Sequence, residues 1–145
     1  MKTFYKFVLI IFLMLSTDAW SNQHVGLLKN VSGDVTIHRG NTLVKAYSGL
    51  QLMSSDILMT KDKSYAGIIF TDGTTITIGP ETEFNISNYQ FEPDVETYAF
   101  SMYLKKGSAI YNSGKIGKLS PESVSLSTPR ASVGVRGTRF IIEVD

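Results

Sequence analysis

Apolar and polar residues alternate with a period of two along most of the chain from Val25 onward. This spacing places successive side chains on opposite faces of an extended strand, so that one face packs into a core and the other meets water. Helical spacing of apolar residues is nearly absent. The pattern predicts an all-β fold, and it is clearest in residues 35–39 and in the sets Ile68 and Phe70, Ile76 and Ile78, Phe84 and Ile86, and Phe140, Ile142 and Val144.

Turn-forming residues separate these apolar runs about every eight to twelve positions, as in small β domains. The strongest turn signal is Asp72-Gly73, because it lies between two alternating runs and can adopt the positive φ angles of a tight hairpin. A similar strand, Gly-Thr, strand pattern in residues 134–142 predicts a second hairpin. We expect surface loops at residues 90–97 and 112–123, which carry prolines, glycines or acidic side chains.

The N-terminal residues have the layout of a secretory signal peptide, with two lysines ahead of an apolar run over residues 7–15. Small residues at Ala19 and Ser21 predict cleavage between Ser21 and Asn22. An uncleaved transmembrane anchor is the alternative, but a span needs about 20 apolar residues and this run is shorter. We therefore predict a signal peptide over residues 1–21, an exported domain over residues 22–145 and no stable transmembrane anchor.

Composition and charge exclude several classes of function. The chain has 145 residues, of which 43% are hydrophobic, so it can form one domain with a core. Its 14 Lys and Arg against 13 Asp and Glu give a net charge of +1, which does not indicate nucleic-acid binding. The absence of cysteine excludes disulfides and thiol catalysis. His24 and His38 lie outside any metal-ligand spacing, so we expect no metal and no cofactor.

No catalytic constellation is evident in the sequence. The chain lacks a G-x-S-x-G motif, and its carboxylates at 81–83 and 92–96 occur in short runs typical of solvated loops. Residues 105–139 are locally cationic, with seven Lys and Arg against the single acid Glu122. This asymmetry is compatible with an acidic protein surface, an anionic glycan or a phospholipid headgroup as partner. The alternative is that these charges fold back among the acidic residues that precede them.

Residues 127–144, STPRASVGVRGTRFIIEV, resemble the signature of the FecR domain, in which TP-x-A-x-V-x-VRGT-x-F precedes an alternating strand. Earlier segments fit in order: GDVTIHRG, GLQLMSSDILMT, the Asp72-Gly73 hairpin and YLKKGSAIY. The resemblance covers roughly residues 25–145. It implies short strands and hairpins in a solenoid-like or twisted-sheet domain outside the cytoplasmic membrane of bacteria. This chain departs from the signalling members of the family because a signal peptide stands in place of their cytoplasmic anti-sigma segment.

Together with the signal peptide, the turn-rich β pattern and the absence of a catalytic constellation, the resemblance predicts a non-enzymatic binding or scaffolding module in the periplasm or the medium. Its expected partner is another envelope protein or a second copy. The last strand is expected to be an exposed edge that a partner strand can extend. One alternative is a self-processing signalling protein, in which the Thr138 hydroxyl attacks the Gly137 carbonyl through a strained turn. The other alternative is a self-associating structural protein. The candidate binding residues are Arg130, Arg136, Gly137, Thr138 and Arg139.

Overall fold

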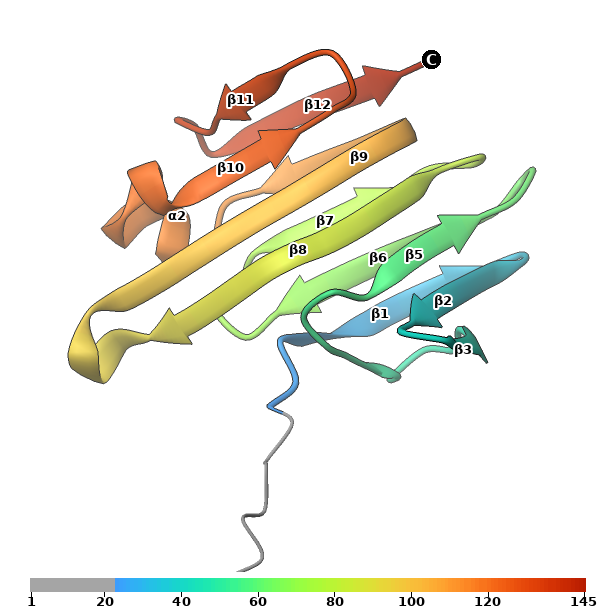
Figure 1. The fold of residues 1–145 in the computed structure, drawn as a ribbon, viewed down its shortest axis with the longest axis horizontal. Coiled ribbons are helices and arrows are strands. Elements are labelled where there is room, and N and C mark those ends of the chain that lie inside the picture. The colour runs from blue at the N-terminus through green and yellow to red at the C-terminus, as the bar shows by residue number, and fades with distance from the viewer. Residues whose placement is uncertain (1–22) are drawn as a thin grey trace, which may run out of the picture.

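The computed structural model describes residues 23–145, and Figure 1 shows them as strands with one short α-helix. The predicted signal peptide and the cleavage site between Ser21 and Asn22 lie outside the described residues. The predicted all-β class is confirmed. The strands are β1 (Gly26–Ser32), β2 (Val35–Arg39), β3 (Thr42–Lys45), β4 (Gln51–Leu52), β5 (Ile57–Thr60), β6 (Tyr65–Phe70), β7 (Thr75–Ile78), β8 (Glu83–Glu92), β9 (Thr97–Asn112), β10 (Val124–Ser127), β11 (Ser132–Gly134) and β12 (Arg139–Val144); the helices are η1 (Pro93–Val95), α2 (Lys115–Leu119) and η2 (Pro121–Ser123).

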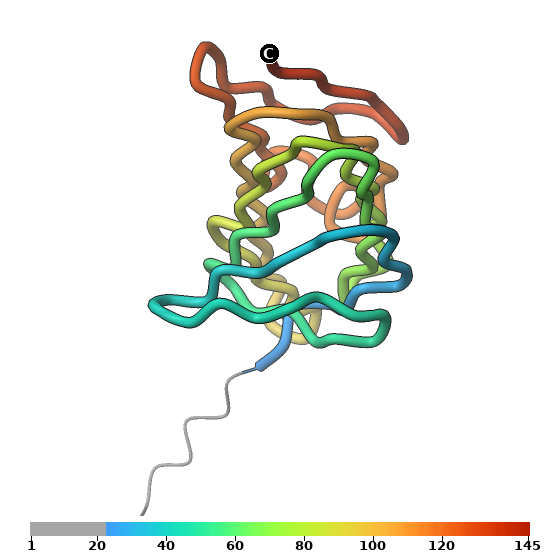
Figure 2. Tube along the Cα trace, turned by 90° about the vertical axis from the view of Figure 1, so that its right-hand side faces the viewer, coloured from blue at the N-terminus to red at the C-terminus, as the bar shows by residue number. Residues whose placement is uncertain are grey.

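The twelve strands form one sheet that curls so that its two parts face each other, as the end-on view in Figure 2 shows. One part runs β4-β1-β6-β7-β9-β12, and the other runs β3-β2-β5-β8-β9-β10-β11. The long strand β9 belongs to both parts. Its first half pairs with β8 and β10, and its second half pairs with β7 and β12. All pairings are antiparallel except β9 with β10, so a twisted, curled sheet describes the fold better than a parallel solenoid.

The chain crosses from one part of the sheet to the other at corners that need unusual backbone angles. Gly33, Lys63, Glu81 and Gly107 occupy four such corners, and all have positive φ angles, of 78°, 51°, 50° and 94°. Glycine is required most clearly at Gly107, where a Cβ would lie 2.6 Å from the Thr82 Cβ. The Thr82 hydroxyl oxygen accepts a hydrogen bond from the Ser108 amide (3.1 Å), which fixes the corner at which β9 changes sides.

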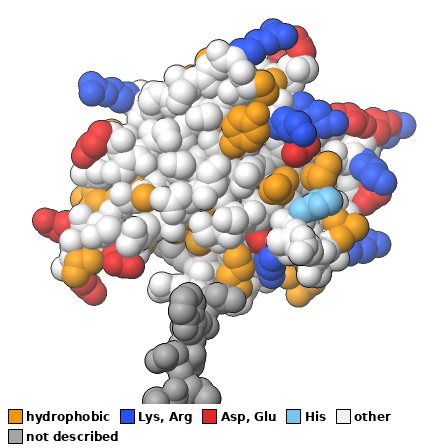
Figure 3. Space-filling view, in the orientation of Figure 1, with side chains coloured by type: hydrophobic (Ala, Val, Ile, Leu, Met, Phe, Trp, Pro, Cys, Tyr) orange, Lys and Arg blue, Asp and Glu red, His pale blue; other side chains and the backbone are white. Residues whose placement is uncertain are grey.

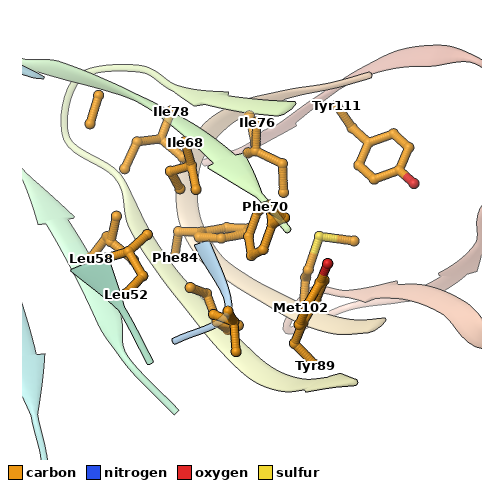
Figure 4. Close-up of a cluster of buried hydrophobic side chains, with 14 of the residues drawn as sticks. Leu52, Leu58, Ile68, Phe70, Ile76, Ile78, Phe84, Tyr89, Met102 and Tyr111 are labelled. Carbon is orange, nitrogen blue, oxygen red and sulfur yellow. The ribbon is translucent and has the colours of Figure 1, made fainter. Parts of the chain in front are cut away.

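The core lies between the two parts of the sheet and consists of the apolar members of the alternating runs (Figure 4). Phe70, Tyr89 and Phe100 form its aromatic centre, with ring centroids 4.7–5.2 Å apart. Tyr111 stacks on Phe140 of β12 at 4.8 Å, which extends the core toward the C-terminal end. The largest of the fully buried side chains are Tyr111, Phe84, Phe100, Leu28, Ile37, Leu52, Leu58, Ile68, Ile76, Ile78, Ile86 and Leu104.

The turns agree in part with the sequence-based predictions. The Asp72-Gly73 hairpin is confirmed: β6 pairs antiparallel with β7, and Gly73 has a φ of 86°. The second predicted hairpin is wrong, because β11 pairs with β10 and β12 pairs with β9 rather than with each other. The expected loop at 90–97 is mostly the end of β8 followed by η1, and the expected loop at 112–123 contains α2 and η2. These short helices depend on tertiary contacts that alternation of apolar residues does not report.

Candidate functional site

The C-terminal strands form one end of the curled sheet, at the top of Figure 1. β10 continues one part of the sheet beside β9, β11 pairs with β10, and β12 continues the other part beside β9. Within residues 23–145, β11 and β12 each pair with a single strand, so each has one unpaired edge. Unpaired edges present backbone N–H and C=O groups that a further strand can bind. The exposed edge that we expected at the last strand, β12, is therefore present among the described residues.

A groove of about 310 Å³ lies between β11 and β12. Its walls are both apolar and charged. Ile142 and Val144 pack against the core from β12, whereas Val133 of β11 is 44% exposed. Ile141 of β12 is 61% exposed and is not among the residues that line the groove. The lining residues are Thr128, Arg130, Ala131, Val133, Ile142, Glu143, Val144 and Asp145.

A second cavity, of about 370 Å³, lies between α2, η2 and the segment that leads into β12. It combines two cationic side chains, one carboxylate and two hydroxyl groups. Its lining residues are Ser113, Gly117, Lys118, Pro121, Glu122, Arg136, Gly137 and Thr138. We call this the α2 cavity.

The structure brings together only part of the candidate set predicted from the sequence. Arg136, Gly137 and Thr138 line the α2 cavity, whereas Arg130 lines the groove between β11 and β12. Arg139 is exposed at the start of β12 and lines neither of them. The candidate residues that line a site are therefore divided between the α2 cavity and the groove, both at the same end of the sheet.

The Gly137-Thr138 peptide lies in an irregular segment, not in a tight turn. Gly137 has no left-handed backbone conformation, because its φ is not positive. β12 begins at Arg139, directly after this peptide. The Thr138 carbonyl accepts a hydrogen bond from the Ser113 amide at 2.8 Å, which fixes the segment against the end of β9.

A family model described as FecR protein matches residues 56–145. This chain belongs to the FecR family. The FecR domain is known from signalling proteins of the bacterial envelope, and the predicted family is confirmed. Searches of the curated proteins and of the solved structures found no match.

The part of this FecR chain ahead of the family match is built into the same sheet. β1 pairs with β6 over six residue pairs, and β2 pairs with β5 over four. Residues 23–55 therefore complete the curled sheet at the end opposite β11 and β12. In the described part of the FecR chain, no helix is long and apolar enough to cross a membrane.

The position of α2 in the FecR domain depends on a buried carboxylate in the β6–β7 hairpin. The Asp72 side chain is buried and accepts hydrogen bonds from the Ile116 amide (3.0 Å) and from the Thr74 hydroxyl (2.8 Å). The Asp72 carbonyl accepts a further bond from the Lys115 amide (2.9 Å). Ile116 is fully buried, so the helix is fixed on one side and presents Gly117 and Lys118 to the α2 cavity.

The cationic side chains of residues 105–139 remain largely free of ion pairs. Within residues 23–145 only Lys105 among them forms a salt bridge, with Glu83 at 3.5 Å. A hydrogen bond from its own backbone amide lowers the pKa of Glu122, with further contributions from the Ser120 hydroxyl and the positive charge of Arg136. On the face drawn in Figure 3, Lys and Arg side chains lie among Asp and Glu side chains and do not form one separate patch. Lys118 and Arg136 are exposed to solvent and line the α2 cavity.

Sequence reasoning missed five residues of the α2 cavity as a site: Ser113, Gly117, Lys118, Pro121 and Glu122. The signal for them was the glycine- and proline-containing segment 112–123, but its fold is set by Asp72, far away in sequence.

His24 and His38 are both exposed. Among the described residues, no group of three His, Asp or Glu side chains lies close enough together to hold a metal ion.

Proposed function

We propose that this FecR-family chain is an exported, non-enzymatic binding module of the bacterial envelope, and that it binds a strand of a partner protein along the free edge of β12. The observation that supports the proposal is the pairing of β12, which has β9 on one side only among the described residues. Export to the periplasm or the medium rests on the N-terminal pattern of charged and apolar residues.

Strand addition suits this end of the molecule for three reasons. The backbone of β12 is ordered by six paired residues of β9, so its free edge is already extended. The neighbouring groove supplies apolar contacts from Val133, Ile142 and Val144. Backbone hydrogen bonds along such an edge give affinity, and side-chain pockets beside it give specificity.

The experiment is site-specific photo-crosslinking in intact cells of the native host. A photoreactive residue replaces Ile141, which is 61% exposed on β12 itself, or Leu43, which is equally exposed on β3 at the other end of the sheet. The proposal expects an adduct with a second envelope protein from position 141 and none from position 43. It also expects slower hydrogen exchange over residues 139–144 when that protein is added to the purified chain.

Other outcomes would replace the proposal with one of the two alternatives. An adduct with twice the mass of the chain favours the self-associating structural protein. The denatured intact mass of the protein from its host tests self-processing, because cleavage between Gly137 and Thr138 leaves two species. That alternative draws support from Glu122, a carboxylate that lines the same cavity as this peptide bond. Loss of cleavage on Thr138→Ala, with folding intact, would favour it over the binding module.

A further inference from the structure

We propose that the α2 cavity binds the oxyanion group of a small ligand, a carboxylate or a phosphate, between Lys118 and Arg136. This inference is independent of strand binding along β12. The cavity is about 370 Å³, which is within the range of about 300–1,000 Å³ typical of small-molecule sites. Its two cationic groups come from two separate segments, Lys118 from α2 and Arg136 from the residues that precede β12.

The charges that line the α2 cavity favour an anion. Lys118 and Arg136 both line it, and neither forms a salt bridge within residues 23–145. Glu122 is the single carboxylate among the lining residues, and its lowered pKa keeps it ionised near neutral pH. The balance is one net positive charge, which a monovalent oxyanion neutralises.

Hydroxyl groups add donors to the same cavity. Ser113 and Thr138 line it and have side-chain O–H groups that can donate to a carboxylate or phosphate oxygen. Such charge-assisted hydrogen bonds are stronger than those between neutral groups. Neutral donors beside two cations distinguish this cavity from a surface patch of lysines.

A buried hydroxyl without a well-formed hydrogen bond lies close to the cavity wall. The Tyr111 side chain is 2% exposed, and its hydroxyl makes no well-formed hydrogen bond among the described residues, although the Ser113 and Thr74 hydroxyls lie close enough to act on its pKa. A Cβ added to Gly117 would lie 3.3 Å from this oxygen and would collide with the Ser113 hydroxyl. The Tyr111 hydroxyl therefore lies close to Gly117, which lines the cavity together with Ser113. A buried hydroxyl without a well-formed hydrogen bond is unfavourable, so a polar ligand that reorients Ser113 toward it gains a hydrogen bond.

The α2 segment is fixed from the opposite side, which leaves the cavity free for a ligand. Asp72 holds the Lys115 and Ile116 amides, and the Ile116 side chain is fully buried. The Thr138 carbonyl is held by the Ser113 amide. Both walls are thus positioned before a ligand arrives, and preorganisation reduces the cost of binding.

The test is titration of the isotope-labelled protein with inorganic phosphate and, separately, with acetate, followed by amide chemical shifts. We expect saturable shifts at Lys118, Gly137 and Thr138. Saturation by phosphate alone assigns a phosphate ligand, and saturation by acetate assigns a carboxylate. Arg136→Gln and Lys118→Gln should each weaken binding by about five- to tenfold, the effect of losing one charge-assisted hydrogen bond.

Matched controls come from the same region. Lys115→Gln removes an exposed cation from the same helix, and Arg130→Gln removes one from the neighbouring groove; both should leave the affinity within about twofold. Shifts that never saturate, or that sodium chloride of equal ionic strength reproduces, would overturn the proposal. Equal weakening by the control variants would also overturn it, because the effect would then be one of net charge. An unchanged spectrum away from the site shows that each variant is folded.

Discussion

The carboxylate of Asp72, in the β6–β7 hairpin, accepts a hydrogen bond from the backbone amide of Ile116 at 3.0 Å, across 44 residues of sequence. The same carboxylate accepts bonds from the Thr74 amide (3.1 Å) and from the hydroxyls of Thr74 and Tyr89 (2.8 and 3.0 Å). A buried carboxylate with this set of donors is satisfied without a cationic partner. One side chain therefore shapes the hairpin and attaches α2, whose residues Gly117 and Lys118 line the α2 cavity.

Replacing Asp72 should destabilise the protein strongly. Asp72→Ala leaves buried donors of Thr74, Tyr89 and Ile116 unpaired, so we expect the free energy of unfolding to fall by about 3 kcal/mol. Urea denaturation measures this change, and hydrogen exchange should show the loss of protection at the Ile116 amide. Asp94→Ala, in the exposed helix η1, removes an equal charge and should change stability by less than about 0.5 kcal/mol. Equal effects of the two variants would falsify the anchoring role.

Two buried tyrosines should respond in opposite ways to loss of the hydroxyl. The Tyr89 hydroxyl contacts the Thr71 hydroxyl (3.0 Å), the Asp72 amide (2.9 Å) and the Asp72 carboxylate. Tyr89→Phe should therefore lower the free energy of unfolding by about 1–2 kcal/mol. Tyr111→Phe removes a hydroxyl that makes no well-formed hydrogen bond among the described residues and only weaker contacts with the Ser113 and Thr74 hydroxyls, so it should be close to neutral or stabilising.

Parallel urea denaturation of both variants tests this pair. The tyrosines share a similar depth of burial, so they control for the loss of core packing. A large destabilisation by Tyr111→Phe would show that its hydroxyl has a partner in solution.

Local patterning was enough to predict most of the strands and one hairpin. Alternation is a direct consequence of a sheet with one buried face, so Val35 and Ile37, or Ile76 and Ile78, point inward as expected. Asp72-Gly73 was predictable because the turn needs a positive φ at glycine. Gly107, after Lys106, also has a positive φ, but no hairpin forms there. Strand β9 continues through Gly107 around a corner of the sheet.

The candidate site was predictable only in part, because long-range contacts decide where its segments lie. The sequence indicated Arg136, Gly137 and Thr138, and these residues do meet in one cavity. It did not indicate Lys118 or Glu122, since α2 has only five residues and is placed by Asp72. Arg130 follows β10 and lies in the groove, which nothing in its local sequence reveals.

The corner at Gly107 should tolerate no side chain. Gly107 has a φ of 94°, and a Cβ there would lie 2.6 Å from the Thr82 Cβ. Gly107→Ala should therefore lower the free energy of unfolding by about 2 kcal/mol or more. Gly134→Ala is the matched control, because its φ is not positive and a Cβ there meets no atom within 4 Å. Thermal denaturation of the two variants compares them, and similar midpoints would contradict the steric argument.

Stability should fall in alkaline solution because of the buried tyrosines. Burial raises the pKa of both Tyr89 and Tyr111 above the ordinary tyrosine value of about 10. As the pH rises past about 10, the unfolded chain releases these protons first and so binds fewer protons than the native state, which lowers the free energy of unfolding. Below that pH neither state is ionised at these groups, and they cause no pH dependence. Urea denaturation at about pH 9 and about pH 11 should show a smaller drop for Tyr111→Phe than for the unmodified chain. Tyr65→Phe, at a position 47% exposed, should leave the drop unchanged; if it reduces the drop as much as Tyr111→Phe does, burial is not the cause.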